Sequence, residues 1–245
     1  MSANVMVPLA QVAEQLGKGF ARVETLHGST YHDNRTVLIV PMRGPMIHHR
    51  VAQTIHGMIS PPNSARACLF VVGHEVGHAY NAAIANVLAD PVLSTWPYVM
   101  TVEDDNLPPP DAHIRLLESI ERHQLDGCSA IYFTRGEWNI PQAWGDPRRG
   151  PNDFQPCDIT GPLERGEVLR VNGIGMGCAL WRMDLFRQIP APWYVTCADV
   201  VPEGGAKCMT QDLYFCQRAR LAGKNFGVDM RVKVGHMDVN TGEVY

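Results

Sequence analysis

Hydrophobic residues along the chain alternate between short continuous runs and longer stretches with helical spacing. The runs are rich in β-branched residues, which suits buried parallel strands, and they lie at residues 36–42, 67–72, 98–102 and 127–134. Helical spacing follows at residues 47–58, 78–89 and 109–123. Strands and helices that alternate in this way predict an α/β fold with a parallel sheet covered on both faces.

This alternation stops at residues 135–166, which are rich in Gly, Pro and Trp. A segment of this length is too long for a routine connection and is typical of a functional lid or a partner surface. Regular structure is predicted to resume after it, with a helix at 210–222 that has Thr210 as its N-cap and a final strand at 226–234.

The N-terminal segment has a different pattern from the rest. Residues 8–26 have helical spacing that Gly17 and Gly19 interrupt, and a polar, turn-like segment follows them. We therefore expect residues 1–35 to form an appendage and residues 36–245 to form a single domain.

Composition narrows the class of protein. The chain has 245 residues, of which 45% are hydrophobic, and a formal net charge of −4, so a strongly basic nucleic-acid binder is not indicated. Its seven cysteines include no C-x-x-C pair, which suggests reduced thiols. No stretch has the basic start of a signal peptide or the apolar length of a membrane span. We expect a cytoplasmic protein.

Residues 74–78 read H-E-V-G-H, a literal match to the zinc-protease pattern H-E-x-x-H. That site needs both histidines on one face of a helix. Here we expect His74 to lie outside a helix that begins near Gly77. The extended pattern also lacks its third ligand, because Asn81 and Ile84 stand where it needs glycine and histidine. A zinc metallohydrolase is kept as an alternative.

Three consecutive acids, Glu103, Asp104 and Asp105, follow the run at 98–102. Ligand sites of open parallel sheets lie beyond the carboxyl ends of the strands. Adjacent carboxylates repel each other unless a cation neutralises them, and oxygen ligands suit Mg²⁺ or Mn²⁺. The pattern predicts a metal or nucleotide site, whereas the structural alternative is a solvated acidic turn before a helix.

Several segments in this order resemble the nucleotide-sugar glycosyltransferases of the GT-A fold, in particular the large family-two group. Residues 37–44 are similar to the first strand and nucleotide loop, and residues 102–106 are similar to the D-x-D metal motif, with Glu103 as its first acid. Residues 173–182 are similar to the acceptor-side segment. Residues 211–216 are similar to the E-D helix, and residues 234–236 are similar to the segment with the late metal-binding histidine. The resemblance covers about residues 36–238.

The resemblance implies a Rossmann-like three-layer sandwich with a mostly parallel central sheet. Residues 36–134 would form the nucleotide-sugar half and residues 135–245 the acceptor half. It also implies Mn²⁺ or Mg²⁺ as cofactor and a nucleotide-diphosphate sugar as donor. The metal ligands implied are Asp105, His236 and Glu103, and the donor-binding residues implied are Pro41, Arg43, His74, Glu75, Tyr80 and Asp104.

Asp212 matches the acid that acts as general base in inverting members of the family. Its preceding residue is Gln211 in place of the usual glutamate. The structural alternative is an acid in the first turn of a helix, where a carboxylate is favoured in any case.

Residues 135–166 would cover the acceptor. The acceptor-side residues implied are Trp138, Trp144, Arg148, Arg149, Gly175 and Met176. Aromatic side chains, Phe154 included, could stack on a sugar or a nucleobase, and the arginines could contact phosphate. The acceptor expected is a glycan or a hydroxymethylated base in DNA. A non-catalytic nucleotide-binding module and a glycoside hydrolase remain alternatives.

Overall fold

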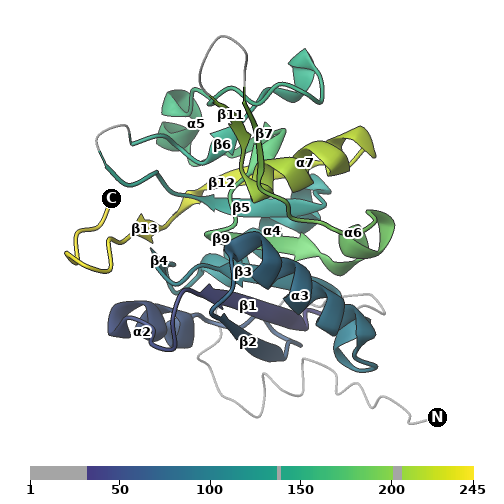
Figure 1. The fold of residues 1–245 in the computed structure, drawn as a ribbon, viewed down its shortest axis with the longest axis vertical. Coiled ribbons are helices and arrows are strands. Elements are labelled where there is room, and N and C mark those ends of the chain that lie inside the picture. The colour runs from purple at the N-terminus through teal and green to yellow at the C-terminus, as the bar shows by residue number, and fades with distance from the viewer. Residues whose placement is uncertain (1–31, 137–138, 201–205) are drawn as a thin grey trace, which may run out of the picture. The chain divides into compact units, whose positions relative to one another are not determined.

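The computed structural model describes residues 32–136, 139–200 and 206–245 (Figure 1). Asp33–Tyr245 form one compact unit. The helix predicted at 8–26 and the candidate residue Trp138 lie outside the described residues, and the division into an appendage and a domain stays a prediction.

A seven-stranded sheet forms the centre of this unit. The strand order is β2 (Arg66–Val72), β1 (Thr36–Met42), β3 (Tyr98–Val102), β9 (Cys178–Arg182), β5 (Gly127–Ile131), β12 (Phe226–Lys233) and β7 (Val168–Val171). Five strands run in one direction, and β9 and β7 run against them. The predicted mostly parallel central sheet is therefore confirmed.

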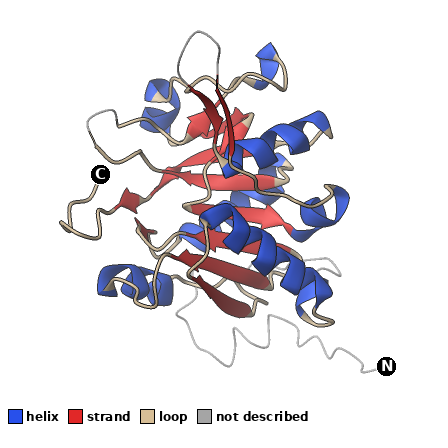
Figure 2. Cartoon of the chain, in the orientation of Figure 1, coloured by secondary structure: helices blue, strands red, loops and turns tan. Residues whose placement is uncertain are grey.

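Helices cover both faces of the sheet, as Figure 2 shows. One core cluster joins the sheet to α3 (Val76–Ala89), α6 (Met183–Gln188) and α7 (Gln211–Leu221). The other joins it to α2 (His49–Gly57) and α4 (Ala112–His123). The predicted three-layer α/β sandwich is confirmed. Among the described helices, none has the length and apolar character needed to cross a lipid bilayer.

The continuous apolar runs are explained by this double cover. In β1, Val37 and Ile39 pack in the cluster with α3, whereas Leu38 and Val40 pack in the cluster with α4. Both faces of the strand are therefore buried, and no polar position alternates with the apolar ones. β1 and β3 have the bounds that the sequence predicts.

The prediction that β2 is fully buried is wrong. β2 is the edge strand of the described sheet, and its side chains are alternately half-buried and exposed. Phe70 and Val72 are 51% and 43% exposed. The apolar residues of this run indicate a strand, but they do not show that only one face of the strand packs against the rest of the protein.

β5 ends earlier than predicted, at Ile131 instead of residue 134. The chain then leaves the sheet in a turn, in which Thr134 N donates to the carbonyl of Ile140 and Gln142 N donates to the carbonyl of Tyr132. This turn carries Tyr132, Thr134 and the next residue, Arg135, to the edge of the sheet where β1 and β3 end.

Shorter elements complete the unit. They are β4 (Asn106–Leu107), β13 (Gly235–His236), β6 (Ala143–Trp144), β8 (Gly173–Ile174), β10 (Cys197–Val200), β11 (Ala206–Met209), α5 (Thr160–Arg165) and the 3-10 turns η1 (Leu93–Thr95) and η2 (Pro147–Arg149). β13 pairs with β4, and β6 pairs with β8. The first of these pairings joins the end of the chain to the segment that follows β3, and the second joins two segments of its second half.

Candidate active site

Two cavities meet beyond the carboxyl ends of β1 and β3. The β1 cavity, of about 470 Å³, is lined on one side by the end of β1 and the start of α3. The α7 cavity, of about 1170 Å³, is lined by the start of α7 and by the segments around β6. The residues that line both cavities are Glu103, Arg135, Gln211 and His236. This is the position at which open α/β sheets bind ligands.

Glu103 stands at the junction of the two cavities, directly after β3. Burial raises the pKa of its carboxyl group to about 8, and the neighbouring Asp105, Asp212 and Asp104 contribute to the rise. The Oε1 atom of Glu103 lies 3.5 Å from the hydroxyl of Tyr80, which opposes this rise. Like charges are crowded here, so a bound cation would be stabilised at this junction.

Asp105 is buried beside Glu103, and its Oδ2 atom faces several nitrogens. Arg43 Nη2 lies at 2.9 Å, and Arg135 Nη2 and His236 Nε2 each lie at 3.5 Å. Burial alone would raise the pKa of Asp105, but His236, Arg135 and Arg43 together hold it below its ordinary value. Asp105 is therefore an ionised carboxylate in the wall of the β1 cavity.

His236 is oriented by its other ring nitrogen. The pairing of β13 with β4 places His236 opposite Asn106, and Nδ1 of His236 lies 2.8 Å from the carbonyl oxygen of Phe133. A carbonyl only accepts, so Nδ1 carries the hydrogen. Nε2 then donates to Asp105 when the ring is charged and presents a lone pair, the form that binds a metal, when the ring is neutral. Metal-bound histidines are commonly held in this way.

The residues present suit Mn²⁺ or Mg²⁺ that is completed by a substrate. Among the residues that the structure describes, no three His, Cys, Asp or Glu side chains are grouped as a metal cage. Mg²⁺ usually takes one or two protein carboxylates and receives its other ligands from water and substrate phosphates. A carboxylate and a histidine lone pair that face each other across 3.5 Å, Asp105 and His236, fit that pattern.

Asp212 lies on the other side of the junction, in the first turn of α7 and in the wall of the α7 cavity. Burial raises the pKa of its carboxyl group. Its Oδ1 atom accepts from Leu213 N at 2.9 Å and from the hydroxyl of Thr210. Thr210 holds the N-cap position, as predicted, but its side chain makes no capping bond to the helix. No described residue donates a hydrogen bond to Oδ2 of Asp212, so that oxygen is free to accept a proton.

Aromatic and amide side chains form the outer wall of the α7 cavity. β6 pairs with β8, with Trp144 opposite Gly173, and this pairing holds Trp144 at the cavity. Phe154 lines the same cavity and packs on Gly173. The side-chain amides of this wall belong to Gln142, Asn152, Gln155 and Gln217. The wall can stack on a ring and exchange hydrogen bonds with neutral polar groups.

Gly175 and Met176 do not lie in the cavity wall, which corrects the prediction that they face the acceptor. Both are buried. A Cβ atom at Gly175 would lie 2.1 Å from the hydroxyl of Tyr132, and that hydroxyl accepts from Gly177 N at 3.0 Å. The glycines allow Tyr132 to pack on the backbone, and it is Tyr132 that lines the cavity.

The predicted donor-side residues are divided between the cavity wall and the core. Those that line the β1 cavity are Pro41, Arg43, His74, Glu75 and Asp104. Tyr80 is fully buried and lies behind Glu103, so the prediction that it contacts a nucleotide directly is wrong. It lies on the face of α3 that packs against the sheet.

The H-E-x-x-H segment does not have the geometry of a zinc-protease helix. α3 begins at Val76, and His74 precedes it, as expected. Glu75 is the N-cap, and its carboxylate accepts from His78 N at 2.9 Å and from the hydroxyl of Thr196 at 3.3 Å. The glutamate that would activate a zinc-bound water is thus used to begin the helix.

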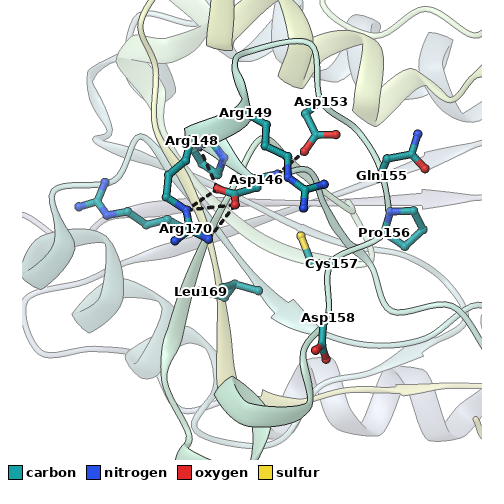
Figure 3. Close-up of a pocket in the computed structure, with 11 residues that line it drawn as sticks. Asp146, Arg148, Arg149, Asp153, Gln155, Pro156, Cys157, Asp158, Leu169 and Arg170 are labelled. Atoms are coloured by element: carbon teal, nitrogen blue, oxygen red, sulfur yellow. Dashed lines mark hydrogen bonds and ion pairs between the residues drawn. The ribbon is translucent and has the colours of Figure 1, made fainter.

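Arg148 and Arg149 line a different cavity, of about 530 Å³, beside η2 (Figure 3). Figure 3 shows Arg148 turned back on Asp146, with which it forms a bidentate ion pair at 2.7 to 3.0 Å. The cavity also contains Asp153 and Asp158. Arg148 and Arg149 therefore do not lie among the aromatic residues of the α7 cavity, which corrects their predicted place on the acceptor surface.

Arg135 was not identified from the sequence, although it lines both cavities and faces Asp105. It stands in the Gly-, Pro- and Trp-rich segment, where nothing local marks it. The available signal was its position shortly after the strand β5, because residues beyond the carboxyl ends of parallel strands gather at one edge of the sheet.

The chain matches no protein-family model and no curated protein. It is similar to a number of solved structures, among them the following two. A197 from STIV superposes with a TM-score of 0.57 at 13% identity, over 84% of this chain and 87% of that one. GalNAc-T7, solved with UDP, GalNAc and Mn²⁺, superposes with a TM-score of 0.53 at 10% identity, over 83% of this chain and 44% of that one. The fold is therefore GT-A-like. At these identities the likeness shows the fold alone, and an activity has to be argued from the residues of the site.

Proposed function

We propose that this GT-A-like protein is a metal-dependent glycosyltransferase that moves a sugar from a nucleotide-diphosphate sugar to an acceptor hydroxyl. The observation that carries the proposal is the meeting of two cavities at one set of residues, Glu103, Arg135, Gln211 and His236. Asp105 and His236, which suit a divalent cation, lie on one side of the junction. Asp212, whose Oδ2 atom is free to accept a proton, lies on the other.

The donor is assigned to the β1 cavity. Asp105 and His236 would hold Mn²⁺ or Mg²⁺, and the ion, when bound, supplies positive charge that stabilises the diphosphate leaving group. Arg43 and His74 line the same cavity and can contact phosphate or ribose. GalNAc-T7, with the same fold, was solved with UDP and Mn²⁺, which supports a nucleotide diphosphate as the ligand class.

Asp212 is assigned the role of general base. An acceptor hydroxyl oxygen in the α7 cavity forms a bond to the anomeric carbon of the donor sugar as the bond from that carbon to the diphosphate oxygen breaks. The hydroxyl proton passes to Oδ2 of Asp212, and the nucleoside diphosphate leaves with the bonding electron pair. Burial raises the pKa of Asp212, which makes its ionised form a stronger base. A single displacement of this kind inverts the anomeric configuration.

A glycan is the acceptor class that the α7 cavity favours. Its outer wall consists of Trp144, Phe154 and neutral amides, and the arginine that lines it, Arg135, faces Asp105 at the junction, whereas a nucleic-acid backbone calls for several Lys and Arg. Arg148 and Arg149 lie in another cavity, and Arg148 is paired with Asp146. A hydroxymethylated base in DNA is the less favoured acceptor.

The test is to incubate the protein with each common nucleotide sugar and Mn²⁺ or Mg²⁺, and to measure release of nucleoside diphosphate with and without glycan or hydroxymethylated DNA. EDTA and Asp105→Ala are expected to abolish release, and Arg122→Ala, on the far helix α4, is expected to leave it unchanged. Absence of release with every donor, or full release in EDTA, would refute the proposal. Stoichiometric zinc that is lost in His78→Ala would instead favour a zinc hydrolase.

A further inference from the structure

The Oδ2 atom of Asp105 faces two guanidinium groups. Arg43 Nη2 and Arg135 Nη2 approach it at 2.9 and 3.5 Å, and His236 Nε2, which carries no hydrogen in the neutral ring, lies at 3.5 Å. A carboxylate oxygen has about two lone pairs. A cation can therefore bond to Oδ2 only if at least one guanidinium moves away.

The carboxylate in this group is fixed, whereas the arginine side chains can move. Asp105 has a side chain that is 5% exposed, its Oδ1 atom accepts from Asn106 Nδ2 at 3.0 Å, and its carbonyl accepts from Met237 N at 2.7 Å. Arg43 and Arg135 have side chains that are 65% and 31% exposed. Neither forms another ion pair within the described part of the chain, so release from Asp105 breaks no second carboxylate contact.

Both guanidiniums also face the space assigned to the donor. Arg43 follows β1 and lines the β1 cavity, and Arg135 lines both cavities. A diphosphate carries more negative charge than a single carboxylate, and the planar fork of arginine matches phosphate oxygens in a bidentate way. The diphosphate is therefore the stronger partner for both side chains.

We propose that Arg43 and Arg135 form an exchangeable pair. In the free protein they neutralise Asp105, and on donor binding they move to the diphosphate oxygens and leave Oδ2 of Asp105 open to the divalent cation. This inference rests on the proposed function for its ligand, a diphosphate. It makes the cation and the diphosphate bind with positive coupling, because each binds better once the other has removed its competitor.

The exchange predicts opposite effects on two ligands, which a merely structural role would not produce. The variants are Arg43→Ala, Arg135→Ala and the double variant, and the probes are Mn²⁺ alone, followed by electron paramagnetic resonance, and inorganic pyrophosphate alone in EDTA, followed by calorimetry. Each single variant is expected to bind Mn²⁺ about threefold to tenfold more tightly and pyrophosphate more weakly by a similar factor. Arg43→Ala keeps the backbone bond from residue 43 to Asp104.

Arg122→Ala is the matched control. Arg122 is 64% exposed and pairs with Glu118 at 2.7 Å on α4, so its loss removes one exposed ion pair outside both cavities. It is expected to change neither affinity. Weaker Mn²⁺ binding in the arginine variants, or unchanged Mn²⁺ affinity in the folded double variant, would overturn the exchange.

The outcome separates this inference from the proposed function. If the affinities for Mn²⁺ and pyrophosphate shift in opposite directions but the protein transfers no sugar, the exchange is supported and the transferase is refuted. If the protein transfers sugar but both affinities shift in the same direction, the transferase is supported and the exchange is refuted. Circular dichroism of each variant establishes that the fold is retained.

Discussion

Nε2 of His236 lies 3.5 Å from Oδ2 of Asp105, although α4, β5 and most of the sheet separate the two residues along the chain. We expect His236→Ala and Asp105→Asn each to reduce metal-dependent sugar transfer on the order of 100-fold or more, because each removes a ligand of the ion that stabilises the leaving group. Steady-state rates over a Mn²⁺ titration check this. Rates within twofold of the unaltered protein at every concentration would show that the pair holds no catalytic ion.

Asp212→Asn tests the general base. It is expected to reduce kcat by about 10²- to 10⁴-fold and to leave the affinity for nucleoside diphosphate unchanged, since only the acceptor proton lacks its partner. Burial raises the pKa of Asp212, so activity of the unaltered protein should fall on the acid side above the ordinary pKa of an aspartate, and the variant should lose this limb. Because a buried carboxylate is removed, the free energy of unfolding should stay equal or increase. A variant that keeps its kcat would exclude this role.

Trp144→Ala separates the acceptor from the donor. Trp144 lines the α7 cavity and not the β1 cavity, so we expect transfer to a glycan to fall by about threefold to tenfold while slow transfer to water is retained. Product analysis with and without acceptor measures both rates. Phe70→Ala, which removes an exposed aromatic side chain on the edge strand β2, is the matched control. An equal loss of both rates in Trp144→Ala would place the tryptophan at the donor instead.

His113 predicts a pH dependence of stability that is independent of the site. Its Nε2 atom lies 3.0 Å from the hydroxyl oxygen of Thr36, which itself donates to the carbonyl of Asn34. Burial, with a contribution from Arg66, lowers the pKa of His113 from 6.5 to about 4. Between these two values the unfolded state binds the proton and the folded state does not.

The contribution of His113 to stability is therefore complete above about pH 6.5 and is lost as the pH falls toward 4, with a slope of at most about 1.4 kcal/mol per pH unit. Urea unfolding of the unaltered protein and of His113→Gln at several pH values between 4 and 7 measures it. The difference between their unfolding free energies should change across this window, and parallel curves would contradict the buried neutral ring.

The strands that helices bury on both faces were predictable from their continuous apolar runs. Residues 36–42 and 98–102 form β1 and β3 with the expected bounds, because helices bury both faces of these strands. The direction of β9 was not predictable, since a short apolar run reads the same in a parallel and an antiparallel strand. The exposed face of β2 could not be predicted for a similar reason, because edge position depends on the order of strands in space.

The candidate site was partly accessible to sequence reasoning. Asp105 and Asp212 carry local signals, one at a strand end and one at a helix start, and the structure brings both to the junction of the cavities. Tyr80 and Met176 were misplaced, because residues next to a binding loop can point into the core as easily as into the cavity. Arg135 was missed, because its role depends on a contact with Asp105 that no local pattern records.

The position of β9 has a consequence for the order of assembly. β9 lies between β3 and β5 and is antiparallel to both, yet it follows both along the chain. During synthesis, β3 and β5 are therefore made long before the strand that joins them. Until residue 182 has been added, each keeps an edge of unpaired backbone groups, and such edges attract other chains. β12, which lies between β5 and β7, is made later still, so the sheet is completed late in translation, and a nascent chain that stalls before β9 leaves strand edges open to aggregation.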